Sequence, residues 1–141
     1  MNALGLSPVA MLCEMDGTFP VHHADPTEPE TLEMLRDRVL SEGLELGFAY
    51  DGDADREGVI DARGEINWGD KLMIIRSRAL LEKHPGATII GEVKCSQTMY
   101  DDIKAHGGRG VLWKTGHSLI KTKMKEERAL LAGEMSGHIF F

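Results

Sequence analysis

The sequence lacks the features that mark several large classes of protein. No apolar run approaches the ~20 residues that a membrane-spanning helix needs, so we expect no membrane partner. Basic residues are in the minority, with 16 Lys and Arg against 23 Asp and Glu and a formal net charge of -7. This charge repels a phosphate polymer over long range and argues against nucleic-acid binding, whereas a locally basic site can still hold a small phosphorylated ligand.

Cysteine is also scarce: Cys13 and Cys95 lie far apart, and neither belongs to a Cys-x-x-Cys pair. This spacing argues against a zinc site or a redox disulfide and indicates two reduced thiols. The stretch from Met1 to Pro8 has no basic start and no long apolar core, so it does not resemble a secretory signal. We therefore expect a cytoplasmic location.

The apolar pattern predicts an α/β protein. Short runs rich in Val, Ile and Leu alternate with helix-like stretches, which is typical of parallel strands joined by crossover helices. A long loop is expected from Glu14 to Pro29. Helices are expected from Thr31 to Gly43, from an N-cap at Asp70 to the Pro85-Gly86 turn, from a cap at Ser96 to about His106, and from the loop at 114–117 to Lys125. Strands are expected at residues 8–13, 44–50, 58–61, 65–68, 88–93, 111–113, 129–132 and 138–141.

The two ends of the sequence predict that it is a segment of a longer protein. Ile139, Phe140 and Phe141 form an apolar strand with nothing after it, although a C-terminal end is usually polar. The first expected strand likewise begins with almost no preceding scaffold. A boundary between Gly64 and Asp70 would divide the chain into two partial α/β units.

Three aspartates follow the end of an expected strand. In Asp51-Gly-Asp-Ala-Asp-Arg56 the acids alternate with small residues, so the carboxylates of Asp51, Asp53 and Asp55 can converge on one point. Hard divalent cations prefer oxygen ligands, and Mg²⁺ usually keeps positions open for phosphate or water. Arg56 adds a fork of donors suited to phosphate oxygens. The pattern favours a Mg²⁺ site over a simple solvated acidic turn.

The same segment partly matches a calcium loop of EF-hand type at residues 53–65. From Asp53 onward several acids fall at acceptable positions, but the twelfth position is Gly64, and the required acid comes one residue late, at Glu65. The preceding stretch alternates like a strand rather than like the helix that enters such a loop. A noncatalytic calcium-binding module is therefore the alternative function.

Three further loops each follow a strand-like run. They are Glu92-Val-Lys94-Cys-Ser96, Lys114-Thr-Gly-His-Ser118 and Gly133-Glu-Met-Ser-Gly-His138. Ligands of open α/β sheets bind beyond the carboxyl ends of the strands, so these loops can line one cleft. Taken singly, Lys94 is more often a surface lysine and His117 a capping or core histidine. Their shared position after strands favours a ligand site.

The last of these loops suits a sugar. Glu134 and Ser136 alternate in an extended turn between two glycines, so both can point one way and bind hydroxyl groups. His138 follows two residues later, and imidazole is suited to proton transfer near neutral pH.

The ordered set of motifs resembles the α-D-phosphohexomutase superfamily. The loops that begin at Asp51, Lys114 and Gly133 are similar to its metal loop and sugar-binding loops, and Glu-Met-Ser-Gly-His is most similar to the phosphomannomutase/phosphoglucomutase branch. The stretch from Asp16 to Pro26, Asp-Gly-Thr-Phe-Pro-Val-His-His-Ala-Asp-Pro, resembles a sequence upstream of the metal loop. The matches extend over nearly the whole chain.

The resemblance implies two partial three-layer α/β units of phosphohexomutase type with mixed sheets. Residues 1–66 would be the C-terminal part of the second of four domains, with the metal loop. Residues 67–141 would be the N-terminal part of the third domain, with the sugar-binding loop. The missing domains of the same enzyme would be its partners.

The resemblance also implies a Mg²⁺-dependent isomerase of carbohydrate metabolism. Such an enzyme moves phosphate between the 1- and 6-positions of mannose or glucose through a hexose 1,6-bisphosphate and a phosphoserine. The implied roles are metal binding by Asp51, Asp53 and Asp55, catalysis by Arg56, Lys94 and His138, and substrate binding by Lys94, His117, Glu134 and Ser136.

One departure from the family pattern is large. The phosphoserine loop of the first domain, of the Thr-Ala-Ser-His-Asn-Pro kind, is absent from this sequence, and so is the phosphate-binding loop of the fourth domain. Without the phosphoryl carrier, we expect the 141 residues to be inactive on their own.

Overall fold

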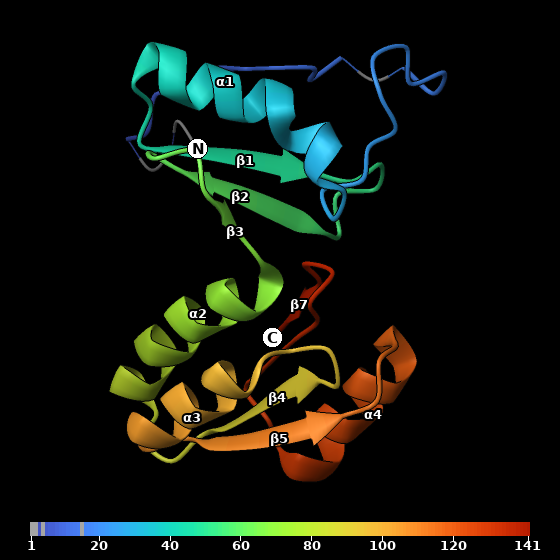
Figure 1. Ribbon diagram of the computed structural model, residues 1–141. Helices are drawn as coiled ribbons and strands as arrows, with labels where there is room; N and C mark the ends of the chain where they lie inside the picture. Colours follow the sequence, from blue (N-terminus) through green and yellow to red (C-terminus); the bar gives the residue numbers. More distant parts are fainter. Residues whose placement is uncertain (1–2, 4, 15) are drawn as a thin grey trace.

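Two sheets, each packed against helices, make up the structure (Figure 1). The computed structural model describes residues 3, 5–14 and 16–141. Along this part of the chain the elements are η2 (Pro29–Leu32), α1 (Glu33–Glu42), β1 (Leu46–Tyr50), β2 (Glu57–Asp61), β3 (Ile66–Asn67), α2 (Gly69–Lys83), β4 (Thr88–Glu92), α3 (Gln97–Ala105), β5 (Arg109–Trp113), α4 (His117–Glu127), β6 (Leu131–Gly133) and β7 (Ile139–Phe140). None of the helices in the described ranges has the length and apolar character that a bilayer crossing needs.

The first sheet is an antiparallel meander in the order β1-β2-β3, with α1 on one face. Helix α1 packs onto the sheet through Leu35 and Val39, which form a cluster with Ile60 of β2. Gly43 ends the helix in the left-handed conformation with φ 61°, as expected for a C-terminal glycine. The other face of β1 leaves Phe48 and Tyr50 exposed.

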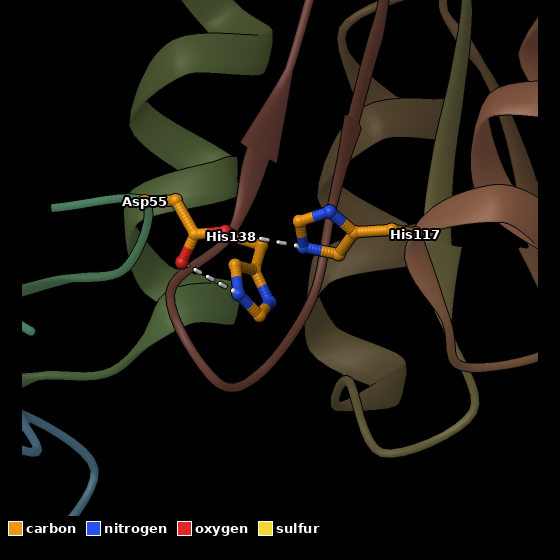
Figure 2. A group of neighbouring side chains, drawn as sticks. All are labelled: Asp55, His117 and His138. Carbon is orange, nitrogen blue, oxygen red and sulfur yellow. Dashed lines mark hydrogen bonds and ion pairs between the residues drawn. The ribbon is translucent and has the colours of Figure 1, made fainter. Parts of the chain in front are cut away.

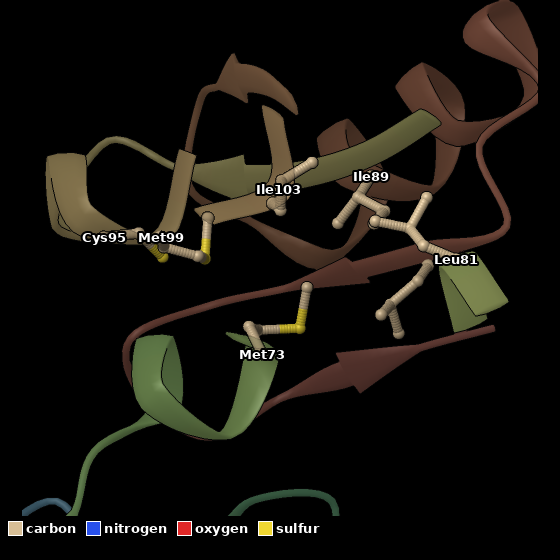
Figure 3. Close-up of a cluster of buried hydrophobic side chains, with 7 residues drawn as sticks. Met73, Leu81, Ile89, Cys95, Met99 and Ile103 are labelled. Carbon is tan, nitrogen blue, oxygen red and sulfur yellow. The ribbon is translucent and has the colours of Figure 1, made fainter. Parts of the chain in front are cut away.

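The second sheet has the order β5-β4-β6-β7 and is mixed. β4 pairs in parallel with β5 and β6, and β7 pairs antiparallel with β6. Ile89 and Ile90 are adjacent in β4 and therefore point to opposite faces. Ile89 joins the core formed with α2 and α3 (Figure 3), and Ile90 joins the core formed with α4. Helices thus cover both faces, which gives an α/β/α arrangement.

Most expected elements are present, but three expectations are wrong. Residues 8–13 form no strand, because a strand needs a hydrogen-bonded neighbour and none lies alongside this run in the described part of the chain. The strands of the first sheet are antiparallel rather than parallel, since a hairpin joins β1 to β2. Trp68, not Asp70, is the N-cap of α2.

Asp70 has turned into the protein instead of capping the helix. Its Oδ1 accepts the backbone N–H of Lys71 at 2.8 Å, and its Oδ2 accepts that of Ser96 at 3.2 Å. The buried carboxylate therefore ties the start of α2 to the start of α3. Ser96 does occupy the N-cap of α3, but its side chain makes no capping hydrogen bond.

The two halves of the chain touch where the hairpin of the first sheet meets the end of the second. Arg56 and His138 form an isolated antiparallel bridge, and the Glu57 N–H donates to the Gly137 carbonyl at 3.3 Å. Gly137 has φ 97°, and a Cβ there would collide with the Glu57 carbonyl oxygen. β3 runs through the boundary expected between residues 66 and 67, since Asn67 still pairs with Val59.

The contact at Gly137 yields a testable prediction. Gly137→Ala combines a strained left-handed backbone with a clash against β2, so we expect a larger loss of unfolding free energy than the about 1–3 kcal/mol of backbone strain alone. Gly107→Ala is the matched control, because Gly107 has φ 79° with nothing near its absent Cβ. Urea denaturation of both variants measures the difference. Equal losses would show that the close approach at Gly137 is unimportant.

Candidate functional site

Asp51 shapes the loop that joins β1 to β2. Its Oδ1 accepts the backbone N–H groups of Asp55 and Arg56, both at 3.0 Å, and its Oδ2 accepts Nε of Arg56 at 2.7 Å. Ala54 takes a left-handed φ of 60°, which lets the loop close over this carboxylate. Because Asp51 is buried while Asp53 and Asp55 are exposed, the loop holds two outer carboxylates above one inner carboxylate.

Oxygen atoms of Asp51, Asp53 and Asp55 all lie within 4.8 Å of one another. The structure thus gathers the three predicted carboxylates. Burial alone would raise the pKa of Asp51, but the backbone N–H and guanidinium of Arg56 outweigh it and hold that pKa below its usual range. Arg56 also lies near Asp25, with Nη1 3.4 Å from the Asp25 Oδ1. Asp25, Asp51, Asp53 and Asp55 together carry more negative charge than Arg56 can neutralise, and a bound cation would offset the excess.

His138 lies between the carboxylates of Asp55 and Glu134, which belong to different halves of the chain. Figure 2 shows its contact with Asp55. Its Nδ1 is 2.6 Å from Oε2 of Glu134, and its Nε2 is 3.1 Å from Oδ1 of Asp55 in the hairpin loop. The Ser136 Oγ is 3.0 Å from the same Nδ1. The imidazole therefore connects the aspartate loop with the turn between β6 and β7.

Glu134 is turned into the protein, with 3% of its side chain exposed. Its Oε1 accepts the Gly116 N–H at 2.8 Å, and its Oε2 faces His138 and Ser136. Burial would raise the pKa of Glu134, but the Gly116 N–H and His138 lower it below the usual value. The carboxylate thus joins the loop before α4 to the turn after β6.

His117 stands at the first position of α4, beside His138. Its Nε2 is 3.7 Å from Oδ2 of Asp55, and its ring meets the His138 ring edge-on with centroids 4.2 Å apart. Phe140 also packs edge-on against His117, with centroids 4.9 Å apart. Two histidines from one sheet thereby face a carboxylate that belongs to the other.

Glu92, at the end of β4, is a central residue that the sequence analysis did not single out. Its side chain is fully buried, and each oxygen has a donor. Oε2 accepts the Lys94 N–H at 3.0 Å and the Thr115 hydroxyl at 2.6 Å, while Oε1 accepts the Met135 N–H at 3.2 Å. One carboxylate therefore holds all three loops that follow β4, β5 and β6. The available signal was a charged residue at the end of the apolar run Thr-Ile-Ile-Gly-Glu.

Lys94 emerges from the loop that Glu92 anchors, with 57% of its side chain exposed. It lines a cavity of about 340 Å³ between the two halves of the chain. The cavity presents two cations and two hydroxyl groups at its wall, together with two larger side chains, Trp68 and Met135. Its lining residues are Thr27, Arg56, Trp68, Lys94, Met135 and Ser136.

The structure thus gathers the predicted residues into three adjoining groups. The aspartate loop, the Asp55–His138–Glu134 chain and the cavity with its two cations meet at the Arg56–His138 bridge. Asp25 and Trp68, like Glu92, lie at the site although the sequence predicted no role for them. Asp25 lies in the segment quoted for the family resemblance, whereas nothing in the sequence singled out Trp68.

Comparison with known proteins identifies the family. A family model described as phosphoglucomutase/phosphomannomutase, alpha/beta/alpha domain III, matches residues 68–141, and the corresponding domain II model matches residues 1–64. The chain belongs to the phosphoglucomutase/phosphomannomutase family. The two matched ranges leave residues 65–67, which include strand β3, between them.

Relatives and solved structures agree with this membership. A phosphomannomutase/phosphoglucomutase of Pseudomonas aeruginosa is 51% identical over the whole chain, and a phosphoglucomutase of Neisseria gonorrhoeae is 45% identical over 99% of it. The crystal structure of a phosphoglucomutase/phosphomannomutase family protein from Burkholderia thailandensis superposes with a TM-score of 0.96 at 44% identity. The superposition covers 99% of this chain and 31% of the Burkholderia thailandensis chain. The chain spans 30% of the length of each of the two named enzymes.

The calcium alternative finds no support in this family member. Residues 57–61, which would lie inside the loop at 53–65, form strand β2, and the residues before the loop form strand β1 rather than a helix. An antiparallel hairpin therefore occupies the place where an EF-hand needs two helices.

Removal of the Glu92 charge tests the role of this buried carboxylate. Glu92→Gln turns one accepting carboxylate oxygen into an amide NH₂ group that faces another hydrogen-bond donor. We therefore expect the free energy of unfolding to fall by about 1–3 kcal/mol. Glu82→Gln, at an exposed site on α2, should leave stability unchanged. Urea denaturation measures both, and amide hydrogen exchange should show faster exchange at Lys94 and Met135. Unchanged exchange at both amides would refute the role given to Glu92.

Acid should loosen the aspartate loop. A carboxyl whose folded pKa is lowered contributes stability that is present above its unfolded pKa and is lost as pH falls through the folded pKa. For Asp51 this window begins near pH 4 and extends downward. We expect that the melting temperature falls on acidification, and that Asp51→Asn lowers it at pH 7 but flattens its acid dependence. Parallel acid curves for the two proteins would contradict this.

Proposed function

We propose that the chain supplies the metal loop and the sugar-binding loops of a phosphohexomutase that interconverts hexose 1-phosphates and hexose 6-phosphates. The observation that carries the proposal is the cavity in which Arg56, Lys94 and Ser136 meet beside the aspartate loop. The cations of Arg56 and Lys94 suit a phosphoryl group, and the Ser136 hydroxyl suits a sugar. Family membership supports the same reaction, since the relatives named above are phosphomannomutases and phosphoglucomutases.

Asp51, Asp53 and Asp55 would hold Mg²⁺. The donor set fits the ion, because all three side chains offer carboxylate oxygens and two of them are exposed. When bound, Mg²⁺ would neutralise charge on a transferring phosphoryl group. Asp51 keeps the loop closed through the backbone N–H groups of Asp55 and Arg56, so it orients the two outer aspartates as well as contributing its own oxygens.

Arg56 and Lys94 would bind the phosphoryl group on the cavity side of the loop. Phosphoryl transfer depends mainly on positioned charge. Asp51 holds the Arg56 guanidinium, and Glu92 holds the Lys94 backbone N–H and lies 3.8 Å from Lys94 Nζ. These contacts place both cations in the cavity wall before a ligand enters. Lys94 would contact the substrate as well as the transferring group.

His138 would be the general acid or base. Glu134 fixes its Nδ1, which leaves Nε2 directed at the aspartate loop where phosphate is to be transferred. His117 would contact the phosphosugar, and Glu134 and Ser136 would bind its hydroxyls. Mannose and glucose phosphates are the proposed substrates, with a hexose 1,6-bisphosphate as intermediate.

The remaining components of this reaction would come from the rest of the enzyme. We assign residues 1–66 to the second domain and residues 67–141 to the third, with the phosphoserine carried elsewhere. We place the enzyme in the cytoplasm, in keeping with two cysteines that form no disulfide.

A chimera tests the proposed function. This chain would replace the matching 30% of the Pseudomonas aeruginosa relative, and we expect a folded protein that interconverts glucose 1-phosphate and glucose 6-phosphate. Asp53→Asn in the chimera should lower kcat/KM on the order of 100-fold or more, because one carboxylate is lost from the cation site. Asp37→Asn, at an exposed position on α1, is the control and should match the unmodified chimera. A folded chimera that acts on no hexose phosphate would overturn the proposal.

A further inference from the structure

The two histidines beside the aspartate loop present a ligand set of a different kind from the three aspartates. Ligand atoms of Asp55, His117 and His138 all lie within 4.8 Å of one another, and Figure 2 shows both imidazoles beside the carboxylate. Nε2 of His138 is 3.1 Å from Oδ1 of Asp55, and Nε2 of His117 is 3.7 Å from Oδ2. Ligands of tetrahedral Zn²⁺ stand about 3.3 Å apart at ordinary bond lengths. The two nitrogens approach different oxygens of the Asp55 carboxylate, at distances on either side of that value.

The far side of His138 is arranged as it is in known metal sites. A metal-bound imidazole usually donates its other ring N–H to a carboxylate, which fixes its orientation. Nδ1 of His138 lies 2.6 Å from the buried Glu134 carboxylate, which is itself held by the Gly116 N–H. His138 is therefore held with Nε2 directed at Asp55. The ring of His117 contacts both His138 and Phe140 edge-on.

We propose that Asp55, His117 and His138 bind a divalent transition-metal ion, with Zn²⁺ as the best fit, at a site that shares only Asp55 with the three-aspartate site. Two imidazole nitrogens and one carboxylate favour Zn²⁺ over Mg²⁺, which prefers oxygen ligands. The ion would replace the hydrogen bond between His138 and Asp55. Entry is open, since 43% of the Asp55 side chain and 39% of the His117 side chain are exposed. A water molecule or phosphate oxygen would complete the coordination.

The new site shares Asp55 with the aspartate cluster, so the two ions compete. An ion at the histidines would also occupy Nε2 of His138, the nitrogen assigned to proton transfer. Zn²⁺ would therefore act as an inhibitor that Mg²⁺ relieves. This consequence rests on the proposed function, whereas the binding itself does not.

Cobalt spectroscopy on the 141-residue chain tests the site without any assay of activity. Co²⁺ is added to a Cys13→Ser background, because the exposed thiol of Cys13 is a competing soft ligand. We expect the intense visible bands of four-coordinate Co²⁺, bleached by one equivalent of Zn²⁺. His117→Ala and His138→Ala should each weaken binding at least tenfold, while His106→Ala, at the exposed end of α3, should leave it unchanged.

Two further measurements separate this site from the aspartates and from loss of fold. Asp53→Asn should keep the Co²⁺ spectrum, and Glu134→Gln should weaken Zn²⁺ binding roughly 10–100-fold without removing a ligand. In the chain that retains all its histidines, ¹⁵N NMR of the imidazoles should show that Zn²⁺ binds Nε2 of both His117 and His138. Zn²⁺ affinity that survives His117→Ala and His138→Ala, or Nε2 signals that do not move, would overturn the site even if the chimera proves active.

Discussion

The imidazole of His138 is the link on which the site depends, because it joins carboxylates from two different sheets. Asp55 belongs to the hairpin of the first sheet and Glu134 to the second. A histidine ring has a fixed width and two opposed nitrogens, so it sets the spacing of the two carboxylates. The Arg56–His138 backbone bridge reinforces this link at the same point. A shift of one sheet against the other would break the side-chain contacts and the bridge together.

The acids of the site fall into two groups with different tasks. Asp51, Glu92 and Glu134 are buried, and each accepts backbone N–H groups from the loops around it. Such bonds offset the cost of desolvating a carboxylate and fix the loop at the same time. Asp53 and Asp55 are exposed and remain accessible to a cation. Burial thus marks the carboxylates that hold the loops in place, in addition to any ligand that Asp51 or Glu134 binds.

The sequence was sufficient to predict most elements and the residues that gather at the site. Helix α1 and the strands of the second sheet follow from apolar periodicity and from glycine, and three of the motifs lie in the loops where parallel strands of that sheet end. The strand predicted at residues 8–13 is absent, because strand propensity does not indicate whether a neighbouring strand is available for pairing. Asp70 is not the N-cap because the helix begins earlier, after Trp68, and its buried carboxylate accepts the N–H of distant Ser96 as well as that of Lys71.

The role of Glu92 was beyond sequence reasoning for a related physical reason. A single glutamate after an apolar strand resembles any strand end until the fold brings Thr115 and Met135 to it, 23 and 43 residues away. The inward turn of Glu134 is a similar case, since an alternating turn predicts that two side chains share a face but not that a backbone N–H from Gly116 will draw one of them in. Sequence spacing indicates which residues can lie close together, whereas the packing of the loops determines which hydrogen-bond donors each side chain contacts.

The short connection between the halves explains why the cavity has a defined shape. Only Trp68 separates β3 from α2, and this residue also lines the cavity. Gly69 follows it at the start of α2, where a Cβ would collide with the Glu134 carbonyl oxygen. Gly137 makes an equally close approach to Glu57 on the other side of the site. The one-residue connector and the Gly137–Glu57 contact hold the aspartate loop against the sugar-binding loops, and the Gly69–Glu134 contact fixes α2 against the turn after β6 within the second half.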